Sequence, residues 1–349
     1  MAKTQGQRRR TMEDVARAVN LSVNTVSRAL NDMPGVSAAT RALIKAEAER
    51  IGYVPNPHAR SLVLGSRRTI GVVVTDLANP FFADLVSEVE AEAATAGYTL
   101  LLLLSDESAD GERDAIETAL RSGVDGLIAV PVQGRSNSWD AVLRAGIPLV
   151  LTGREIPQLG VDFYSNDNEA GMRMTTGVVL DAGATDVVLI EEDLPISTVH
   201  HRIAGFRQAL ESRGLSYDSH RTELIPSRRS SRAALPWRAE DAYLVANDIL
   251  DRRKPDAFVV GNDYLALGVY KALRERYIRI PDDVLVIGWG DYPFSRYLDP
   301  PLSTLRMPSV EVARRAIHRL LQRLDGTAEG GPITDFIQPE LTLRASTTR

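Results

Sequence analysis

The sequence predicts a small all-α head followed by a larger α/β core. Near the N-terminus, two short amphipathic helix patterns are joined by a tight turn. From residue 70 onward, short apolar runs alternate with amphipathic helix patterns, and this alternation occurs as two consecutive series. The 349 residues leave room for two or three domains with a sizeable core. We therefore expect a helix-turn-helix headpiece and an α/β core of two doubly wound parallel-sheet subdomains.

The first predicted helix begins directly after Thr11, whose side chain can form a capping box with Asp14. Its apolar residues are spaced i, i+3, i+4 and i+7, so they share one face that can pack against neighbouring helices. These residues are Met12, Val15, Ala16 and Val19.

The second predicted helix follows a tight corner at Asn20 and begins after Ser22, a suitable N-cap. A helix with an outward polar face can enter the major groove of DNA, where Asn suits the adenine edge and Arg the two acceptors of guanine. The alternative is a solvated amphipathic hairpin without a nucleic-acid partner. The apolar anchors are Val23, Val26 and Leu30, and the outward polar residues are Asn24, Ser27, Arg28 and Asn31.

A third helix is predicted to begin at Ser37 and to end at Gly52, with Ile44, Ala48 and Ile51 on one face. The two prolines that follow favour an extended exit from the head. Three short helices of this size give a headpiece with a very small hydrophobic core.

Charge is distributed unevenly between the head and the rest of the chain. Residues 1–62 contain ten basic and five acidic residues, a net charge of +5, whereas the remainder carries −10. A basic head on an acidic body suits a protein that docks one end on phosphates. The run from Arg8 to Arg10 has a simpler interpretation as a solubilising, disordered arm.

The predicted core contains two series of strand and helix units. In such sheets a ligand binds outside the carboxyl ends of the strands, so the cleft between two sheets is the natural binding place. A further helix, over residues 309–324, follows the second series. Strands are predicted at 70–75, 98–104, 126–130 and 149–151, then at 187–190, 223–225, 257–260 and 284–287, with helices near 200–213, 237–251 and 262–276.

Several function classes find no support in the sequence. The chain has no cysteine, which fits a reducing cytoplasm. No apolar stretch follows the basic N-terminus, so neither an export signal nor a membrane span is predicted. The five scattered histidines and the lack of a glycine-rich phosphate loop predict no metal site, no cofactor and no catalytic residue. We expect a cytoplasmic protein that is not an enzyme.

The segments LSVNTVSRALN, VSAATR and IGYVPNPHARSL, with their fixed spacings, resemble the lac repressor (LacI/GalR) family of bacterial transcription regulators. The rest of the chain has the length and rhythm of that family's effector-binding core, which is similar to periplasmic binding proteins. The resemblance implies a headpiece over 1–55 with a disordered arm at 1–10, a hinge helix over 56–66 and a core over 67–349. It also implies an N-subdomain of 67–164 and 293–324, and a C-subdomain of 165–292 and 325–349.

The resemblance assigns DNA contacts to two segments. In the second helix it places Val23, Asn24 and Arg28 at base edges, and Thr25 and Ser27 near phosphates. In the hinge it implies that Leu62, with Ala59 alongside, wedges into the minor groove at a flexible base step. The alternative for Leu62 is packing on the core. Relatives often carry a basic residue where this chain has Val63, so one backbone contact of the family is missing here.

The resemblance also assigns an effector site in the core. The residues that match family contacts are Phe81, Arg202, Trp237, Asn262 and Trp289.

Two positions of this site depart from the family pattern. Gly290 and Gly153 stand where sugar-binding members often have carboxylates. Asp263, Asp291 or Arg154 are candidates to compensate. A carbohydrate is the leading effector class by family frequency, and an anionic metabolite held by Arg154 and Arg202 is the alternative.

The sequence thus predicts a homodimeric transcription regulator, a repressor that binds a pseudo-palindromic operator under the control of a small molecule, either a sugar or another polar metabolite. The expected dimer interface combines the first core helices with residues 277–300. The competing classes are a two-lobed sugar-binding transport protein and a metabolic enzyme with a doubly wound fold. Neither explains the basic head.

Overall fold

The computed structural model describes residues 10–53, 67–134, 138–226 and 239–348. The chain divides into two compact units, a head within residues 1–68 and a core formed by residues 69–349. The predicted hinge at 56–66 and residues 1–9 of the predicted arm lie outside the described residues.

The head consists of the three predicted helices, α1 (Met12–Val19), α2 (Val23–Leu30) and α3 (Ala38–Arg50). They pack around a small core, and its fully or almost fully buried residues come from all three helices. These residues are Val15, Ala16, Val26, Ala29, Ile44 and Ala48.

The helix caps of the head are those the sequence predicts. The capping box of Thr11 and Asp14 is present at the start of α1, and Asn20 ends that helix in a left-handed conformation with φ of 54°. Ser22 and Ser37 cap α2 and α3 by accepting backbone N–H groups in the first turn. Local side-chain chemistry therefore determines where each helix begins.

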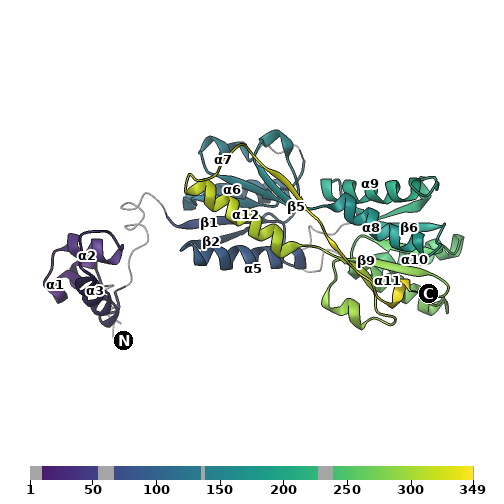
Figure 1. The fold of residues 1–349 in the computed structure, drawn as a ribbon, viewed down its shortest axis with the longest axis horizontal. Helices are drawn as coiled ribbons and strands as arrows, with labels where there is room; N and C mark the ends of the chain where they lie inside the picture. Colours follow the sequence, from purple (N-terminus) through teal and green to yellow (C-terminus); the bar gives the residue numbers. More distant parts are fainter. Residues whose placement is uncertain (1–9, 54–66, 135–137, 227–238, 349) are drawn as a thin grey trace, which may run out of the picture. The chain divides into compact units, whose positions relative to one another are not determined.

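The first lobe of the core is a six-stranded parallel sheet in the order β11-β5-β4-β3-β1-β2. Helices α5 and α12 cover one face of this sheet and α6 and α7 cover the other (Figure 1). The elements are β1 (Thr69–Val74), α5 (Pro80–Thr95), β2 (Thr99–Leu104), α6 (Ala109–Ser122), β3 (Gly126–Ala129), α7 (Asp140–Arg144), β4 (Leu149–Thr152), η1 (Pro157–Leu159), β5 (Asp162–Asn166), α12 (Ser309–Leu324) and β11 (Thr334–Ile337).

The second lobe repeats the architecture with the order β12-β10-β9-β8-β6-β7, in which only β12 is antiparallel among the described strands. Helices α8 and α9 cover one face and α10 and α11 the other. The elements are α8 (Asn168–Asp181), β6 (Val187–Asp193), α9 (Ser197–Glu211), η2 (Ser219–Arg221), β7 (Thr222–Pro226), α10 (Ala239–Arg252), β8 (Ala257–Val260), α11 (Asp263–Glu275), β9 (Leu285–Trp289), η3 (Pro293–Tyr297), β10 (Ser303–Arg306), β12 (Glu340–Thr342) and η4 (Ala345–Thr347).

The two doubly wound sheets confirm the predicted fold class, but the subdomain boundaries at 293 and 325 are wrong. Strand β10 still pairs with β9 in the second lobe, so the chain returns to the first lobe only after Arg306. Strand β11 pairs with β5 in the first lobe, so the last crossing follows Ile337. Figure 1 shows α12 beside α5 in the first lobe and the C-terminus in the second. Long-range strand pairing sets these boundaries.

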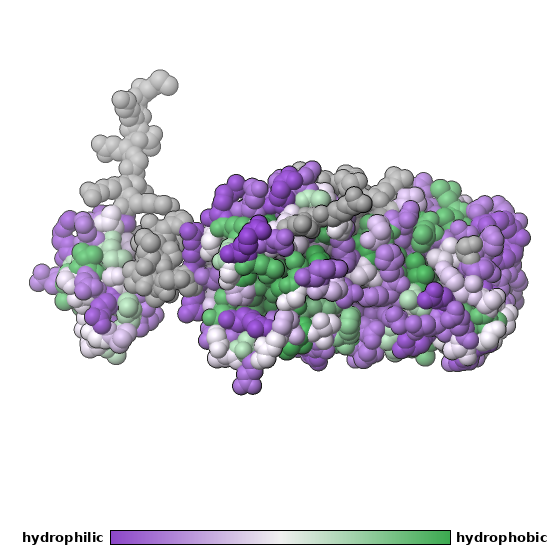
Figure 2. All heavy atoms as spheres, turned by 90° about the horizontal axis from the view of Figure 1, so that it is seen from above, coloured by the Kyte–Doolittle hydropathy of each residue, from purple (hydrophilic) through white to green (hydrophobic). Residues whose placement is uncertain are grey.

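The surface of the core is uneven in polarity. On the face drawn in Figure 2, hydrophobic residues gather over the first lobe, between hydrophilic rims. Among the helices that the structure describes, none is both long and apolar enough to cross a membrane.

Candidate functional site

Helix α2 presents a polar face to solvent, as its sequence pattern predicts. Val26 and Ala29 are buried in the head and Asn24 is exposed. The prediction of Val23 as an apolar anchor is wrong, because this first residue of α2 is 43% exposed. The Ser22 hydroxyl accepts the Thr25 N–H at 3.1 Å and shares a 2.8 Å hydrogen bond with the Thr25 hydroxyl. The start of α2 is therefore rigidly capped, and its first turn is open to a partner.

Arg28 makes a contact that the sequence did not predict. Its Nε donates to the Pro34 carbonyl at 3.1 Å, and its Nη2 donates to the same oxygen. A Cβ at Gly35 would lie 2.7 Å from Arg28 Nη2, so glycine leaves room for this arrangement. The guanidinium thus closes the loop between α2 and α3.

A cavity lies between the two lobes of the core, at the carboxyl ends of their strands. Together with the open solvent at its mouth, it comprises about 540 Å³ of space not occupied by protein atoms. Four of the five predicted effector residues, Phe81, Arg202, Asn262 and Trp289, line it together, and Trp237 lies outside the described residues. Further lining residues include Asn79, Gly153, Arg154 and Asn166 from the first lobe, and Asn168, Glu192, Ile196, Thr198 and Tyr292 from the second.

Arg202 on α9 is buried and held by a carboxylate. Its Nε and Nη2 donate to the two oxygens of Glu191, at 2.8 and 3.0 Å. Its guanidinium carbon lies 5.3 Å from the centroid of the Trp289 ring, a cation–π arrangement. Burial raises the pKa of Glu191, and the charge of Arg202 opposes that rise.

Arg154, which follows β4, is paired in the same way. Its two terminal nitrogens donate to the carboxylate of Glu107, and Nη1 also donates to the Pro131 carbonyl at 3.2 Å. The side chains of Arg154 and Glu107 are 2% and 9% exposed. Among the described lining residues, both guanidinium groups therefore already have a carboxylate partner.

Amides and aromatic rings supply much of the remaining wall. Asn262 caps α11 through its Oδ1, which accepts the Tyr264 N–H at 2.9 Å, and its Nδ2 donates to Tyr292 Oη at 3.0 Å. Asn166 Nδ2 donates to Asn168 Oδ1 at 3.1 Å. The buried indole Nε1 of Trp289 has no hydrogen-bond partner within the described residues.

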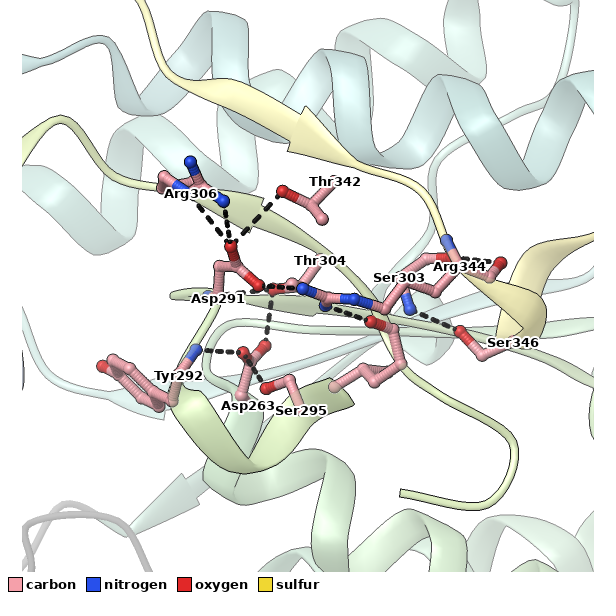
Figure 3. Close-up of polar contacts among 11 residues, drawn as sticks. Asp263, Asp291, Tyr292, Ser295, Ser303, Thr304, Arg306, Thr342, Arg344 and Ser346 are labelled. Carbon is pink, nitrogen blue, oxygen red and sulfur yellow. Dashed lines mark hydrogen bonds and ion pairs between the residues drawn. The ribbon is translucent and has the colours of Figure 1, made fainter. Parts of the chain in front are cut away.

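Asp263 and Asp291, considered as substitutes for the carboxylates missing at Gly153 and Gly290, bond to residues of the second lobe instead (Figure 3). Asp263 accepts from Ser295 Oγ at 2.6 Å, Thr304 Oγ1 at 2.7 Å and the Tyr292 N–H at 3.1 Å. Its burial raises its pKa, and these hydrogen bonds oppose that rise.

Asp291 lies between two guanidinium groups. It accepts from Arg306 Nη2 at 2.8 Å and from Arg344 Nη2 (Figure 3). Burial opposes its ionisation, but the hydrogen bonds from Arg344 and Arg306 outweigh burial and hold its pKa below the usual value. Neither Asp263, the first residue of α11, nor Asp291, which follows β9, lines the cavity.

The glycine at 290 has a local cause. Its φ of 132° is a conformation that other residues rarely adopt, and a Cβ would lie 2.8 Å from Tyr292 Cζ. The ring of Tyr292 thus takes the space beside Gly290 and brings its own hydroxyl to Asn262. Sequence reasoning missed Tyr292. Asn166 and Asn168 were missed because strand β5, which ends at Asn166, was not predicted.

No cluster of His, Cys, Asp and Glu side chains suited to a metal ion occurs in the part of the chain that the structure describes.

A three-helix head with an exposed second helix, joined to two lobes around a cavity, defines a DNA-binding regulator with an effector-binding core. Residues 11–56 match the model of bacterial regulatory proteins of the lacI family, and residues 177–347 match a periplasmic binding protein-like domain. The transcriptional repressor PurR of Vibrio parahaemolyticus is 30% identical over 336 residues, covering 96% of this chain and 97% of that protein. The chain belongs to the LacI family of bacterial regulatory proteins.

Other relatives are also similar to this chain over almost its whole length. The ribose operon repressor of Haemophilus influenzae is 28% identical and covers 96% of this chain and 98% of that protein. A lac repressor structure with bound ONPG, in the repressed state, is 25% identical with a TM-score of 0.82, and covers 97% of this chain and 100% of that one. A complex of the regulator CelR with cellobiose is 25% identical with a TM-score of 0.72, over 97% and 100% of the two chains.

These relatives are transcription regulators, which confirms the prediction that the chain is not an enzyme. The match extends through the head, so the transport-protein alternative is also excluded.

Proposed function

We propose that this protein is a transcriptional repressor that binds a pseudo-palindromic operator as a homodimer and is controlled by a small polar molecule in the cavity. One observation carries the proposal: the cavity walls come from both lobes. An occupant that contacts both lobes stabilises one arrangement of the lobes over others. That preference is the coupling free energy that an effector needs to change DNA affinity.

The head supports the operator side of this proposal. Val23 and Asn24 are exposed in the first turn of α2, where side chains can meet base edges in the major groove. Thr25 and Ser27 on the same helix are the proposed phosphate contacts. For Arg28 we propose that the operator competes with the Pro34 carbonyl for its guanidinium. The hinge residues Ala59 and Leu62 complete the proposed contact set.

The charge of the cavity favours a neutral, polyhydroxylated effector over an anionic one. Arg154 and Arg202 are each neutralised by a buried carboxylate, and Glu192 adds an acidic side chain to the wall. An anion would have to replace one of these carboxylates, which leaves a buried charge unpaired. Amides and an indole N–H, by contrast, exchange hydrogen bonds with sugar hydroxyls without any change of charge. Relatives named ribose operon repressors make ribose the first sugar to test.

We further propose that the protein acts in the cytoplasm as a dimer that uses α5 and residues 277–300. Tyr277 and Tyr297 in that segment are 92% and 81% exposed, which supports a contact surface there.

The operator proposal is tested by comparing Arg28→Ala with Arg50→Ala in the full-length protein, by fluorescence anisotropy on a symmetric promoter fragment and on scrambled DNA. Arg50 lies on α3, is paired with Glu47 and is exposed, so its variant removes the same charge from the same head. We expect Arg28→Ala to cost about 1–3 kcal/mol on the promoter fragment and much less on scrambled DNA. Equal losses on both DNAs would disprove base recognition by Arg28.

The effector proposal is tested by thermal shift with D-ribose, other neutral sugars, sugar phosphates and nucleosides, followed by operator binding with each compound that stabilises the protein. We expect a neutral sugar to raise the melting temperature and to change operator affinity. Stabilisation by sugar phosphates alone would contradict the proposed effector class. A stabilising sugar that leaves operator affinity unchanged would contradict the coupling.

A further inference from the structure

Helix α9 of the second lobe begins without a cap from its own sequence. Its N-cap residue is Ile196, which has no side-chain acceptor, whereas the neighbouring helices α8 and α11 begin with the capping side chains of Asp167 and Asn262. The first N–H groups of an α-helix have no partner within the helix and need an acceptor from elsewhere.

The acceptor for α9 comes from the other lobe. The N–H of Ser197, the first residue of α9, donates to Gln133 Oε1 at 2.6 Å. Gln133 follows β3 in the first lobe, and its Nε2 donates to the Glu155 carbonyl of the same lobe at 2.7 Å. One amide side chain thus joins the helix start of one lobe to the backbone of the other.

Two further contacts hold this bridge in place. One turn along α9, His201 Nε2 lies 3.5 Å from the Glu155 carboxylate, on the same side of the cleft. The backbone N–H of Val132, next to Gln133, donates to the buried carboxylate of Glu112 at 2.6 Å. The side chain of Gln133 therefore extends from an anchored segment.

The bridge lies at the edge of the cavity. Arg154, Ile196, Thr198 and Arg202 line the cavity, and Glu155, Ser197 and His201 are their immediate neighbours in the chain. Any separation of the lobes at this edge must break the hydrogen bond between Gln133 and Ser197.

We propose that Gln133 is a positioning residue that holds the two lobes closed by capping α9 across the cleft, and that it thereby sets the fraction of protein ready to retain an effector. This inference rests on the proposed control by lobe closure. The stabilisation is modest, because opening exchanges the hydrogen bond between Ser197 and Gln133 for hydrogen bonds to water.

The test measures the lobes directly, without effector or DNA. Because the chain contains no cysteine, the pair Arg144→Cys and Arg207→Cys introduces two unique spin-label sites, on α7 and on α9. Both positions are exposed, and Figure 1 shows α7 and α9 along the same side of the two lobes. Pulsed electron-spin measurement of the full-length protein then gives the distance distribution between the lobes.

Three variants isolate the hydrogen bond. Gln133→Met keeps the length of the side chain but removes its donor and acceptor, and Gln133→Glu keeps an acceptor for Ser197. The matched control is Gln208→Met, because Gln208 bonds Glu169 and Arg173 within the second lobe. We expect Gln133→Met to raise the ratio of long to short distances about five-fold, the effect of one hydrogen bond. Gln208→Met should match the parent protein. Gln133→Glu should open less than Gln133→Met, because it keeps the acceptor for Ser197 but loses the donor to the Glu155 carbonyl.

An independent readout keeps the proposal testable if a variant folds poorly. In the parent protein, amide exchange at Ser197 should be slowed, although a first-turn amide normally exchanges freely. An unprotected Ser197, an unchanged distance in Gln133→Met, or equal opening in Gln133→Met and Gln208→Met would overturn the proposal. Operator and sugar binding can each succeed or fail without affecting these measurements, so failure of the bridge is distinguishable from failure of the proposed function.

Discussion

The head and the core use charged side chains in different ways. In the head, Asp32 pairs with Arg41 and Lys45, at 2.9 and 2.8 Å, but its own side chain is 61% exposed. In the core, Arg319 and Arg323 pair with Asp162, and the side chains of Arg319 and Asp162 are 6% and 3% exposed.

Exposed ion pairs in the head and buried ion pairs in the core have different effects on stability. Exposed ion pairs contribute little to stability because water screens them, so the head can exchange its pairs for DNA phosphates at small cost. Buried pairs are costly to break because one charge is left without water or a partner. The arginines of the core therefore hold the framework, and the head carries the charges that are free to exchange partners.

The strongest test of this contrast is Asp162→Ala in the core. It leaves Arg319 buried with only carbonyl partners, so we expect a loss of about 3–5 kcal/mol in the free energy of unfolding. Urea unfolding followed by tryptophan fluorescence reports on the core alone, since Trp139, Trp237 and Trp289 all belong to it. Asp335→Ala, which removes a carboxylate paired with the exposed Arg315, is the matched control and should cost far less. Comparable losses would refute the contrast.

The Asp162 carboxylate also makes the stability of the core depend on pH. Burial raises the pKa of Asp162, but hydrogen bonds from Arg323, Ile333 and Arg319 outweigh it, so the folded-state pKa lies below the unfolded value. Its stabilisation is therefore complete above about pH 4, the unfolded pKa, and is lost as the pH falls further. Asp162→Ala should lose its disadvantage under those acidic conditions.

Glu112, which is fully buried on α6, should have a smaller effect on the stability of the core. Its pH dependence should be opposite to that of Asp162. Burial raises its pKa to about 6, against the hydrogen bond from Val132. A raised pKa means that the stabilisation is present below the unfolded value of about 4.5 and is lost as the pH rises through about 6.

Glu112→Gln should consequently stabilise the core by about 2 kcal/mol at pH 8 and leave it nearly unchanged at pH 4. The control is Glu117→Gln on the exposed side of the same helix. Urea midpoints at the two pH values check the prediction, and a benefit that does not depend on pH would contradict burial of a charge as its cause.

The smallest effect is expected at Asp32 in the head. Asp32 has φ of 53°, which Asn also tolerates, so Asp32→Asn removes the charge without backbone strain. We expect Asp32→Asn to lower the free energy of unfolding of the head by less than about 1 kcal/mol, because its ion pairs are exposed. In 1 M salt the effect should vanish. Hydrogen exchange of the α2 and α3 amides at low and high salt measures it. A large loss that persists in high salt would show that the head also depends on its ion pairs.

Much of the fold could be predicted because its signals are local. Caps such as Ser22 and the turn at Asn20 act within a few residues, and the buried strands are continuous apolar runs. Strand β5 was missed because its sequence, DFYSN, is largely polar although all five residues are buried. Strands β10, β11 and β12 are short and are defined by pairing with distant strands, which leaves no local pattern.

The sequence predicted most of the chosen cavity residues, but it did not predict the charge partners of the two arginines. Resemblance named Phe81, Arg202, Asn262 and Trp289, and the structure brings these residues to one cavity. Their role as effector contacts stays a prediction. The partners Glu191 and Glu107 carry no sequence signal, and they decide that the cavity offers paired guanidinium groups instead of free cations.

The three head helices, the apolar strands of the core, the basic head and the polar face of α2 follow from the sequence alone, because capping, periodicity and charge act between near neighbours in the chain. The crossings of the chain between lobes, the partners of the buried arginines and the bridge from Gln133 to α9 depend on segments far apart in the sequence. Only the folded chain brings such groups together, since hydrogen bonds and ion pairs act over a few ångströms in space.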